Sequence, residues 1–151
     1  MPSGTNNLYN RWALNIGRSV NLSTPPTVKM TLHTSGYTAN QDTHEVYADL
    51  TNELPTANGY TSGGITLTGV TWSRSGAIAT FDCSDPIWTV VTANLVARTY
   101  AYRLIGTFDT LVDPLIGWGL LDSANVDVTT TPGNTLTVTI NASGLFTVTR
   151  T

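Results

Sequence analysis

Charge is scarce in this chain. Charged residues make up 11% of the sequence, against about 25% in a typical soluble domain. Lys29 is the only lysine, no cluster of lysine and arginine occurs, and the net charge is −3. Binding to a nucleic-acid backbone or to an anionic membrane surface requires a dense positive face. We therefore expect neither nucleic acid nor a membrane as a partner.

Cysteine and long hydrophobic runs are also nearly absent. The single cysteine, Cys83, excludes an internal disulfide framework and a multi-cysteine zinc site. We expect it to be a buried residue at a strand end, because the neighbouring Asp82 and Asp85 would raise the pKa of its thiol. No apolar run approaches the roughly 18 residues of a spanning helix, and no signal peptide is recognisable. We expect synthesis in the cytoplasm.

Threonine takes the place of the missing charge, at 28 of 151 positions. A β-branched residue is favoured in strands, where it fits a half-buried pleated surface. Alternating or continuously apolar segments indicate seven to nine strands. The clearest of them are residues 27–33, 65–72, 95–105, 115–121 and 135–141. The pattern predicts an all-β fold, an antiparallel and barrel-like β-sandwich, with residues 1–151 forming a single domain.

Two of these strands are expected to form hairpins with the next segment. Residues 65–72 would return through 77–81, and residues 135–141 would return through 145–149. Residues 95–105 are apolar or aromatic on both sides, which is typical of a central strand covered on each face. In residues 27–33 the alternation predicts a half-buried strand with His33 facing solvent.

Two short helical segments are predicted beside the strands. Leu8, Trp12 and Ile16 recur at a spacing of four, which favours an amphipathic helix within residues 5–17; an irregular arm anchored by Trp12 is the alternative. Residues 44–50 are predicted to form the second helical segment, of one or two turns. Asn58-Gly59 and Gly63-Gly64 mark backbone turns at which larger residues are penalised.

One group of residues has the composition of a metal site. Asp42, His44 and Glu45 lie close together in sequence, with Asp49 four residues further on. These side chains are potential ligands of a divalent ion. The alternative, which we favour, is helix-start chemistry: Asp42 or Thr43 caps the first turn and Glu45 lies near its positive end. We predict no metal site.

Catalytic patterns are equally weak. No G-x-S-x-G elbow is present, and the serines considered as nucleophiles lie in ordinary turn contexts: Ser19, Ser62 and Ser143. A glycosidase would require two carboxylates, for which Asp109, Asp113 and Glu53 are candidates, although loop carboxylates are normally just solvated. No phosphate-binding loop follows Gly63-Gly64. We therefore predict no catalytic residue and no cofactor, and not an enzyme.

Aromatic residues are the remaining candidates for binding. They could form the core, the centre of a protein–protein interface or a platform for sugar rings, and we rank these roles in that order. The residues concerned are Trp12, Trp72, Trp88, Trp118, Tyr37, Tyr47, Tyr60, Tyr100 and Tyr102.

Several stretches resemble a known family. Within Tyr37–Leu67, the runs D-T-H-E-V-Y-A-D-L and N-G-Y-T-S-G-G-I-T-L are similar to a recurrent pattern in virion structural proteins of tailed bacteriophages. Four further stretches match in order, so that the resemblance covers nearly the whole chain. They are L-Y-N-R-W near the N-terminus, A-R-T-Y-A-Y-R-L at Ala97–Leu104, P-L-I-G-W-G-L at Pro114–Leu120 and the closing N-A-S-G-L-F-T-V. The chain departs from the pattern at T-T-T-P-G-N, where the family commonly has more acidic residues.

The resemblance implies a structural role in the phage particle, without chemistry. The first expectation is a decoration or cement protein of the capsid, made in the host cytoplasm and located in the virion. Its partners would be the major capsid protein or other virion proteins and further copies of itself. A protein of the tail or head–tail junction, and a carbohydrate-binding adhesin module, remain as alternatives.

Overall fold

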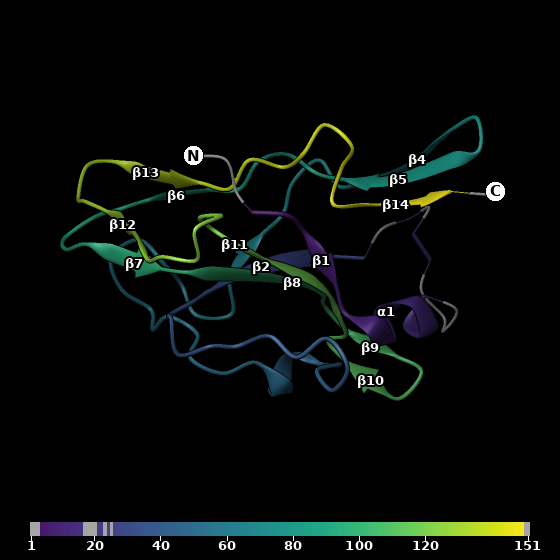
Figure 1. The fold of residues 1–151 in the computed structure, drawn as a ribbon, viewed down its shortest axis with the longest axis horizontal. Coiled ribbons are helices and arrows are strands. Elements are labelled where there is room, and N and C mark those ends of the chain that lie inside the picture. The colour runs from purple at the N-terminus through teal and green to yellow at the C-terminus, as the bar shows by residue number, and fades with distance from the viewer. Residues whose placement is uncertain (1–3, 17–20, 23, 25, 150–151) are drawn as a thin grey trace.

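The computed structural model describes residues 4–16, 21–22, 24 and 26–149 (Figure 1). The strands are β1 Asn7–Leu8, β2 Val28–His33, β3 Ile65–Thr66, β4 Thr71–Ser75, β5 Ile78–Asp82, β6 Ile87–Thr89, β7 Leu95–Ala97, β8 Thr99–Leu104, β9 Thr107–Phe108, β10 Leu111–Val112, β11 Leu115–Leu120, β12 Val128–Thr130, β13 Thr135–Thr137 and β14 Phe146–Thr149. The helical segments are α1 Asn10–Asn15 and the 3-10 helix η1 Tyr47–Asp49. Every strand pairing of the described residues is antiparallel, which confirms the predicted all-β fold.

A five-stranded main sheet, in the order β1-β11-β8-β2-β3, lies in the middle of the molecule. Its central strand β8 is buried at all six positions, as the apolar character of residues 95–105 predicts. That segment is divided at Arg98 into β7, which pairs with β12, and β8. The central position of β8 therefore follows from a sequence that can be buried on both faces.

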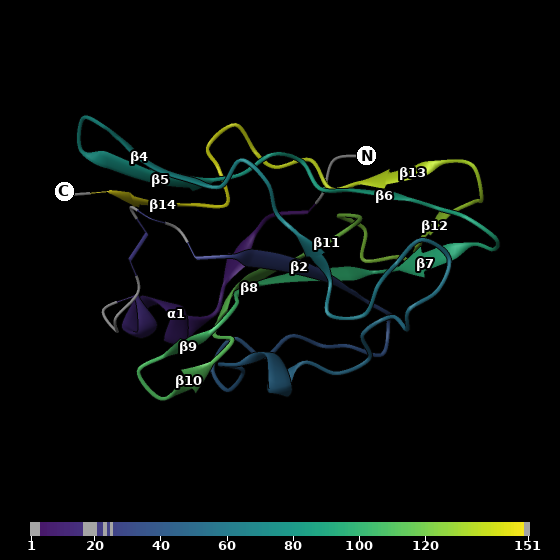
Figure 2. The same ribbon diagram turned by 180° about the vertical axis from the view of Figure 1, so that it is seen from behind.

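The outer sheets cover one face of the main sheet, as Figures 1 and 2 show from opposite sides. They are the three-stranded sheet β14-β5-β4 and the pair β13-β6. Side chains from both layers meet between them and form a single hydrophobic cluster, which confirms the layered sandwich. Its largest fully buried members include Trp12, Tyr100, Tyr102, Phe81, Met30 and Leu32. No strand pairing of the described residues closes the sheets into a barrel.

Two glycines of β11 give the tyrosines of β8 room in this core. Gly119 is opposite Tyr100 and Gly117 is opposite Tyr102 in the antiparallel register. A Cβ at either glycine would overlap the phenol group of its neighbour. The tyrosine rings can lie across β11 only because these positions have no side chain.

The pairing of two segments differs from the predicted hairpins. The hairpin of β4 and β5 is present, but Ile65 and Thr66 pair with β2 in the main sheet instead of continuing it. Residues 135–149 do not form a hairpin: β13 pairs with β6 and β14 pairs with β5. The first prediction was right for residues 71–82 and wrong for Ile65 and Thr66, and the second was wrong. A turn brings strands near each other, but burial selects their partners. Here each strand pairs where an aromatic neighbour completes the core, Leu136 opposite Trp88 and Phe146 opposite Phe81.

The helices are shorter than predicted. Helix α1 covers Asn10–Asn15, with Trp12 buried and Ile16 half-buried as the spacing predicts. Leu8 lies outside the helix, because it belongs to β1 and pairs with Gly117 at the edge of the main sheet. The excursion at residues 44–50 contains only the single turn η1. Among the described residues, no helix combines the length and the apolar character needed to cross a bilayer.

The second face of the main sheet is covered by irregular chain. Residues 34–64, which we call the loop layer, run for most of their length beneath β2 and β8, on the side opposite the outer sheets (Figures 1 and 2). Their last part reaches around to β6, where Gly59 lies against the carbonyl of Thr89. The predicted turns lie in this layer: Asn58, Gly59, Gly63 and Gly64 all have positive φ, from 55° to 93°. Gly64 passes so close to the Met30 carbonyl that a Cβ would overlap it.

Replacing Gly119 by alanine should lower the free energy of unfolding by about 2–3 kcal/mol. The added Cβ would overlap the ring of Tyr100, which is fully buried and has no free space to move into. Urea unfolding measures the loss. Gly133→Ala is the control, because nothing surrounds that site and only its φ of 84° is unfavourable, at about 1 kcal/mol. Equal losses in the two variants would contradict the packing argument.

Candidate functional site

The most elaborate polar arrangement of the molecule lies between the main sheet and the loop layer. Side chains of β2 and β8 on this face include Thr31, His33 and Arg103, which are 1%, 0% and 4% exposed. The prediction that His33 faces solvent was therefore wrong. The alternation of β2 does place its polar side chains on one face, but the loop layer covers that face. We call this buried set, together with Tyr47, Glu53 and Tyr60, the polar layer.

Glu53 is the centre of the polar layer. Its carboxylate accepts hydrogen bonds from the hydroxyl of Tyr47, from the hydroxyl of Tyr60 at 2.6 Å and from the backbone N–H of Gly63 at 2.6 Å. Burial, followed by the bond to Glu53, raises the pKa of both tyrosines, so each remains a protonated donor. Three donors on one carboxylate connect η1, the turn at Gly63 and the strand edge into one unit.

Tyr60 also completes the edge of the main sheet. β3 pairs with β2 only at Lys29 and Met30, so the next backbone donor on that edge, the N–H of Leu32, has no strand partner there. The Tyr60 hydroxyl accepts that hydrogen bond at 3.2 Å while donating to Glu53. Tyr60 is 2% exposed, and a buried backbone donor without an acceptor would be costly. The side chain therefore substitutes for a missing ladder bond.

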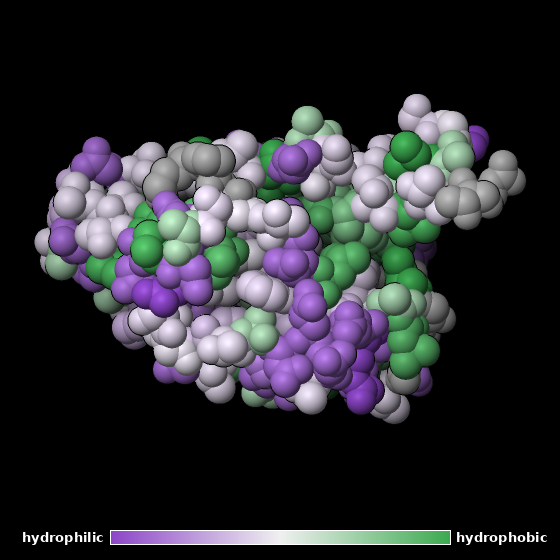
Figure 3. Space-filling model, viewed as in Figure 1, coloured by the Kyte–Doolittle hydropathy of each residue, from purple (hydrophilic) through white to green (hydrophobic). Residues whose placement is uncertain are grey.

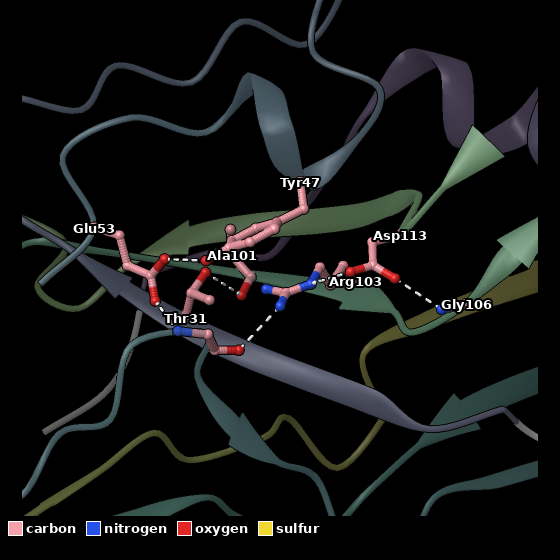
Figure 4. Close-up of polar contacts among 8 residues, drawn as sticks. Thr31, Tyr47, Glu53, Ala101, Arg103, Gly106 and Asp113 are labelled. Atoms are coloured by element: carbon pink, nitrogen blue, oxygen red, sulfur yellow. Dashed lines mark hydrogen bonds and ion pairs between the residues drawn. The ribbon is translucent and has the colours of Figure 1, made fainter. Parts of the chain in front are cut away.

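Arg103 carries a buried positive charge beside this network (Figure 4). Its Nη2 donates to the carbonyl of Gly63 at 3.1 Å, and its Nε lies 3.6 Å from Oδ2 of Asp113. The guanidinium carbon is 3.5 Å from the centre of the Tyr47 ring, a cation–π contact. Nε and Nη1 make no hydrogen bond within the described structure, so the charge is balanced by Asp113 and the ring face.

His33 is held in a neutral form by its surroundings. Its Nδ1 donates to the carbonyl of Thr51 at 2.8 Å, and in the neutral ring Nε2 accepts from the Thr31 hydroxyl at 2.8 Å. The same hydroxyl also lies 3.3 Å from the carbonyl of Ala101, so its proton is shared between the two acceptors. The Tyr37 ring packs at 4.7 Å between centroids. Burial lowers the pKa of His33, against a smaller opposing effect of the bond to Thr51 and of Glu53. A buried neutral imidazole with both nitrogens bonded serves to connect β2 to the loop layer.

A second hydrogen-bond chain connects the helix start to the loop layer. The Tyr9 hydroxyl lies 2.7 Å from that of Tyr37, which lies 3.1 Å from Nδ1 of His44. The N–H of Asn40 also points at this nitrogen, at 3.4 Å, so Nδ1 is the acceptor and Tyr37 the donor. Burial raises the pKa of Tyr9 and of Tyr37. Neither hydroxyl is poised to release its proton.

The metal-like group Asp42, His44, Glu45 and Asp49 is divided among different partners. Asp42 accepts from the side chain of Asn10, and Glu45 forms an ion pair with Arg11 at 3.4 Å. Within the described ranges, no group of three or more His, Cys, Asp or Glu side chains could hold a metal ion.

The predicted helix cap was also assigned to the wrong residues. Asp42 and Thr43 cap nothing, because the helical turn begins later, at Tyr47. Asp49 accepts from the backbone N–H groups of Glu45 and Val46 at 2.8 and 2.9 Å, which is the N3 half of a capping box. Asp49 thus lies after the helix start in sequence, and its side chain bonds back to the backbone at that start.

The cysteine and the serines that were considered as reactive residues do not lie in reactive settings. Cys83 is buried as predicted, and burial, followed by Asp82 and Asp85, raises the pKa of its thiol to about 12. Ser62 and Ser143 are exposed in turns, and Ser19 lies outside the described residues.

The three carboxylates considered for glycoside hydrolysis do not form a pair around an open site. Figure 4 shows Glu53 and Asp113 on opposite sides of Arg103. Asp113 also accepts from the N–H of Gly106 at 2.8 Å, across the hairpin of β9 and β10. Asp109 is exposed at the turn of this hairpin, with φ of 59°.

The aromatic residues mainly form the core, as ranked first. Trp72, Trp118 and Tyr47 are half-buried, and the remaining six are buried. The buried ones are Trp12, Trp88, Tyr37, Tyr60, Tyr100 and Tyr102.

Sequence reasoning did not identify Arg103, Tyr47 and Tyr60 as members of one network. A signal was present for Arg103, since a charge inside a strand that is apolar on both sides requires a buried partner. No comparable signal marks the tyrosines, whose partners lie on other elements.

Comparisons with known proteins add no relative to this description. No protein-family model, curated protein or solved structure matches the chain. What the arrangement can do chemically is therefore argued from its contacts. His33 bonds the main sheet to the loop layer, and Asp42 and Glu45 bond the loop layer to α1. Glu53, Asp49 and His44 bond within the loop layer. Both kinds of bond serve structural cohesion.

Replacing Tyr60 by phenylalanine should lower the free energy of unfolding by about 1–3 kcal/mol. The change leaves the N–H of Leu32 without its acceptor and Glu53 without one donor. Tyr102→Phe is the matched control, because among the described residues the hydroxyl of that buried tyrosine makes a single, long hydrogen bond, 3.4 Å to the carbonyl of Leu145. Chemical denaturation of both variants gives the comparison. A larger loss in Tyr102→Phe would refute the importance of the polar layer.

Stability should fall on mild acidification because of His33. Its pKa is lower in the folded protein than the value of about 6.5 expected in the unfolded chain. The stabilisation is therefore complete above about pH 6.5 and is lost as the pH falls toward the folded pKa, by at most about 1.4 kcal/mol per pH unit. Thr31, Thr51, Tyr37, Glu53 and Arg103 are the groups that face this imidazole.

The measurement is the free energy of unfolding at about pH 7.5 and at about pH 5.5. Both values lie above the pH range in which carboxylates usually titrate. His33→Gln should flatten the dependence. A slope that survives in His33→Gln would assign the effect to another group.

Proposed function

We propose that this protein is a non-enzymatic structural component of a tailed-bacteriophage particle, a decoration protein that stabilises the capsid through protein–protein contacts. The observation that carries the proposal is an exposed sheet face with little charge. Adjacent residues of a strand point to opposite faces. Because Trp72, Phe81 and Phe146 lie in one register row and point inward, the alternate rows of β14-β5-β4 point outward.

This outer face has the chemistry of an adhesive surface. Three register rows point outward. The two rows nearest the hairpin turn contain hydroxyl and aliphatic side chains and no charged residue: Ser73, Thr80, Thr147, Ser75, Ile78 and Thr149. The third row, Thr71 and Asp82, carries one acid, whose carboxylate accepts from the N–H of Cys83. Ile78 is 45% exposed. Removing water from hydroxyl and apolar groups costs far less than removing it from charges. The face can therefore be covered by a partner at little cost, and depletion of charge is typical of interface centres.

Two further observations support a structural role. The acids and the single histidine of residues 37–67, where the resemblance to virion proteins is densest, are used for bonds within the loop layer and to α1. The chain also lacks the positive face that binding to the packaged nucleic acid would require. A protein that adds contacts at capsid joints needs a rigid body and an adhesive face, and no reaction.

The test is binding to expanded empty heads of the phage that encodes the protein, followed by measurement of their rupture temperature. We expect the protein to sediment with the heads and to raise this temperature. Thr147→Glu should abolish both effects, because it places a charge in the centre of the outer face. Ser123→Glu is the matched control, with the same charge on an exposed loop between β11 and β12. Unchanged binding by Thr147→Glu would remove the outer face from the contact.

The same experiment separates the alternatives. Purified tails are included beside the heads, and retention on tails alone would assign the protein to the tail or head–tail junction. A glycan array covers the adhesin alternative. Binding to neither heads nor tails, with binding to a sugar, would overturn the capsid role.

A further inference from the structure

We propose that the tip of the β4-β5 hairpin docks into an acidic groove of a second copy of this chain, so that copies join head to tail. The proposal does not depend on the capsid role, because the contact requires only this protein. It is based on two surfaces of the molecule that are complementary in shape and charge.

The first surface is the underside of a projecting arm. The sheet β14-β5-β4 extends past the main sheet, as Figures 1 and 2 show. The row Phe146, Phe81 and Trp72 packs on the core, and the next inward-facing row is Val148, Ala79 and Arg74. This second row lies on the core side of the sheet, yet Val148 is 50% exposed.

The arm also carries an accessible positive charge at its end. Arg74 is exposed, and its side chain donates to the carbonyl of Gly76 in its own hairpin turn, at 2.7 Å. The turn contains Gly76 and Ala77, because Ser75 pairs with Ile78. No atom lies within 4 Å of a Cβ built on Gly76. The tip is therefore narrow, unobstructed, apolar on its underside and cationic.

The second surface is a groove of about 520 Å³ between the loop layer and the hairpin of β9 and β10, within the size range of pockets that hold small ligands. Val46, Leu111 and Val112 provide apolar walls, and Val112 is 60% exposed. The charged residues of the lining are three acids and one arginine: Glu45, Asp49, Asp113 and Arg11. When the charge of the buried Arg103 beside Asp113 is counted as well, the net charge of the groove is still negative.

The groove lies in the most acidic part of the molecule. Figure 3 shows hydrophilic residues gathered over the loop layer, below the level of the main sheet. Six of the ten carboxylates belong to the loop layer or the adjoining β9–β10 region: Asp42, Glu45, Asp49, Glu53, Asp109 and Asp113. An apolar tip with one arginine matches an apolar groove with acidic walls.

Because arm and groove are different surfaces, the contact is heterologous. Each copy offers its arm to one neighbour and its groove to another, which generates a ring or an open chain of copies. A hairpin tip buries less than the roughly 1,200 Å² of a stable interface. A single contact is therefore weak, and we expect association in the range of about 0.1–1 mM, weakened by salt because the charges are exposed.

The test is sedimentation velocity at concentrations from about 10 μM to about 1 mM, at low and at high salt. The sedimentation coefficient of the unmodified protein should rise with concentration, and less so at high salt. Arg74→Glu and Val112→Arg should each sediment as monomers, since each places like charges in contact.

An equimolar mixture of these two variants should associate again. The arm of the Arg74→Glu variant is then acidic and meets the groove of the Val112→Arg variant, which has gained a positive charge. The native arm of the second variant meets the native groove of the first. Recovery in the mixture also shows that both variants are folded.

Matched valines test the arm without changing the arginine. Val148→Asp and Val126→Asp introduce the same charge at residues that are each 50% exposed, but only Val148 lies on the arm. We expect the first to be monomeric and the second to behave as the unmodified protein. A monomer at about 1 mM, a mixture that does not recover, or equal effects of the two aspartates would overturn the proposal.

Discussion

The carboxylate of Glu53 and the donors around it are the interaction on which the second half of the architecture depends. The main sheet has a hydrophobic face, which the outer sheets cover, and a polar face, which needs partners that can form hydrogen bonds. Tyr47, Tyr60 and Gly63 donate to one carboxylate, and Arg103 reaches the carbonyl of the same glycine. Irregular chain can cover a sheet only if its own polar groups are satisfied there.

This constraint explains why residues of several ionisable types lie together in the interior of the molecule. His33, Glu53 and Arg103 are close to one another, but burial and bonding commit each of them to a structural partner. Their unfavourable desolvation is offset by bonds between elements, so the polar layer specifies which loop covers which strands.

The exposed surface complements this interior. The outer face of β14-β5-β4 carries a single acid, Asp82 at its inner end, while most of the acidic residues gather at the loop layer and the hairpin of β9 and β10. The proposed capsid contact and the proposed contact between copies use different parts of the molecule, the centre of the outer face and the underside of the arm. Both could therefore operate in one assembly, with copies joined laterally while they adhere to a shell.

The sequence by itself determined the all-β class, the central position of the segment containing β8, the inward alternation of Leu136, Val138 and Ile140, and the turns at Gly59 and Gly64. These features depend on neighbouring residues, whose alternation and backbone freedom are visible along the chain. Tertiary structure alone decided that His33 is buried, that β13 and β14 pair with different strands, and that Tyr60 completes the edge of β2. Whether a polar face meets water or a partner depends on distant segments, because hydrogen-bond donors and acceptors are satisfied by whatever the fold brings to them.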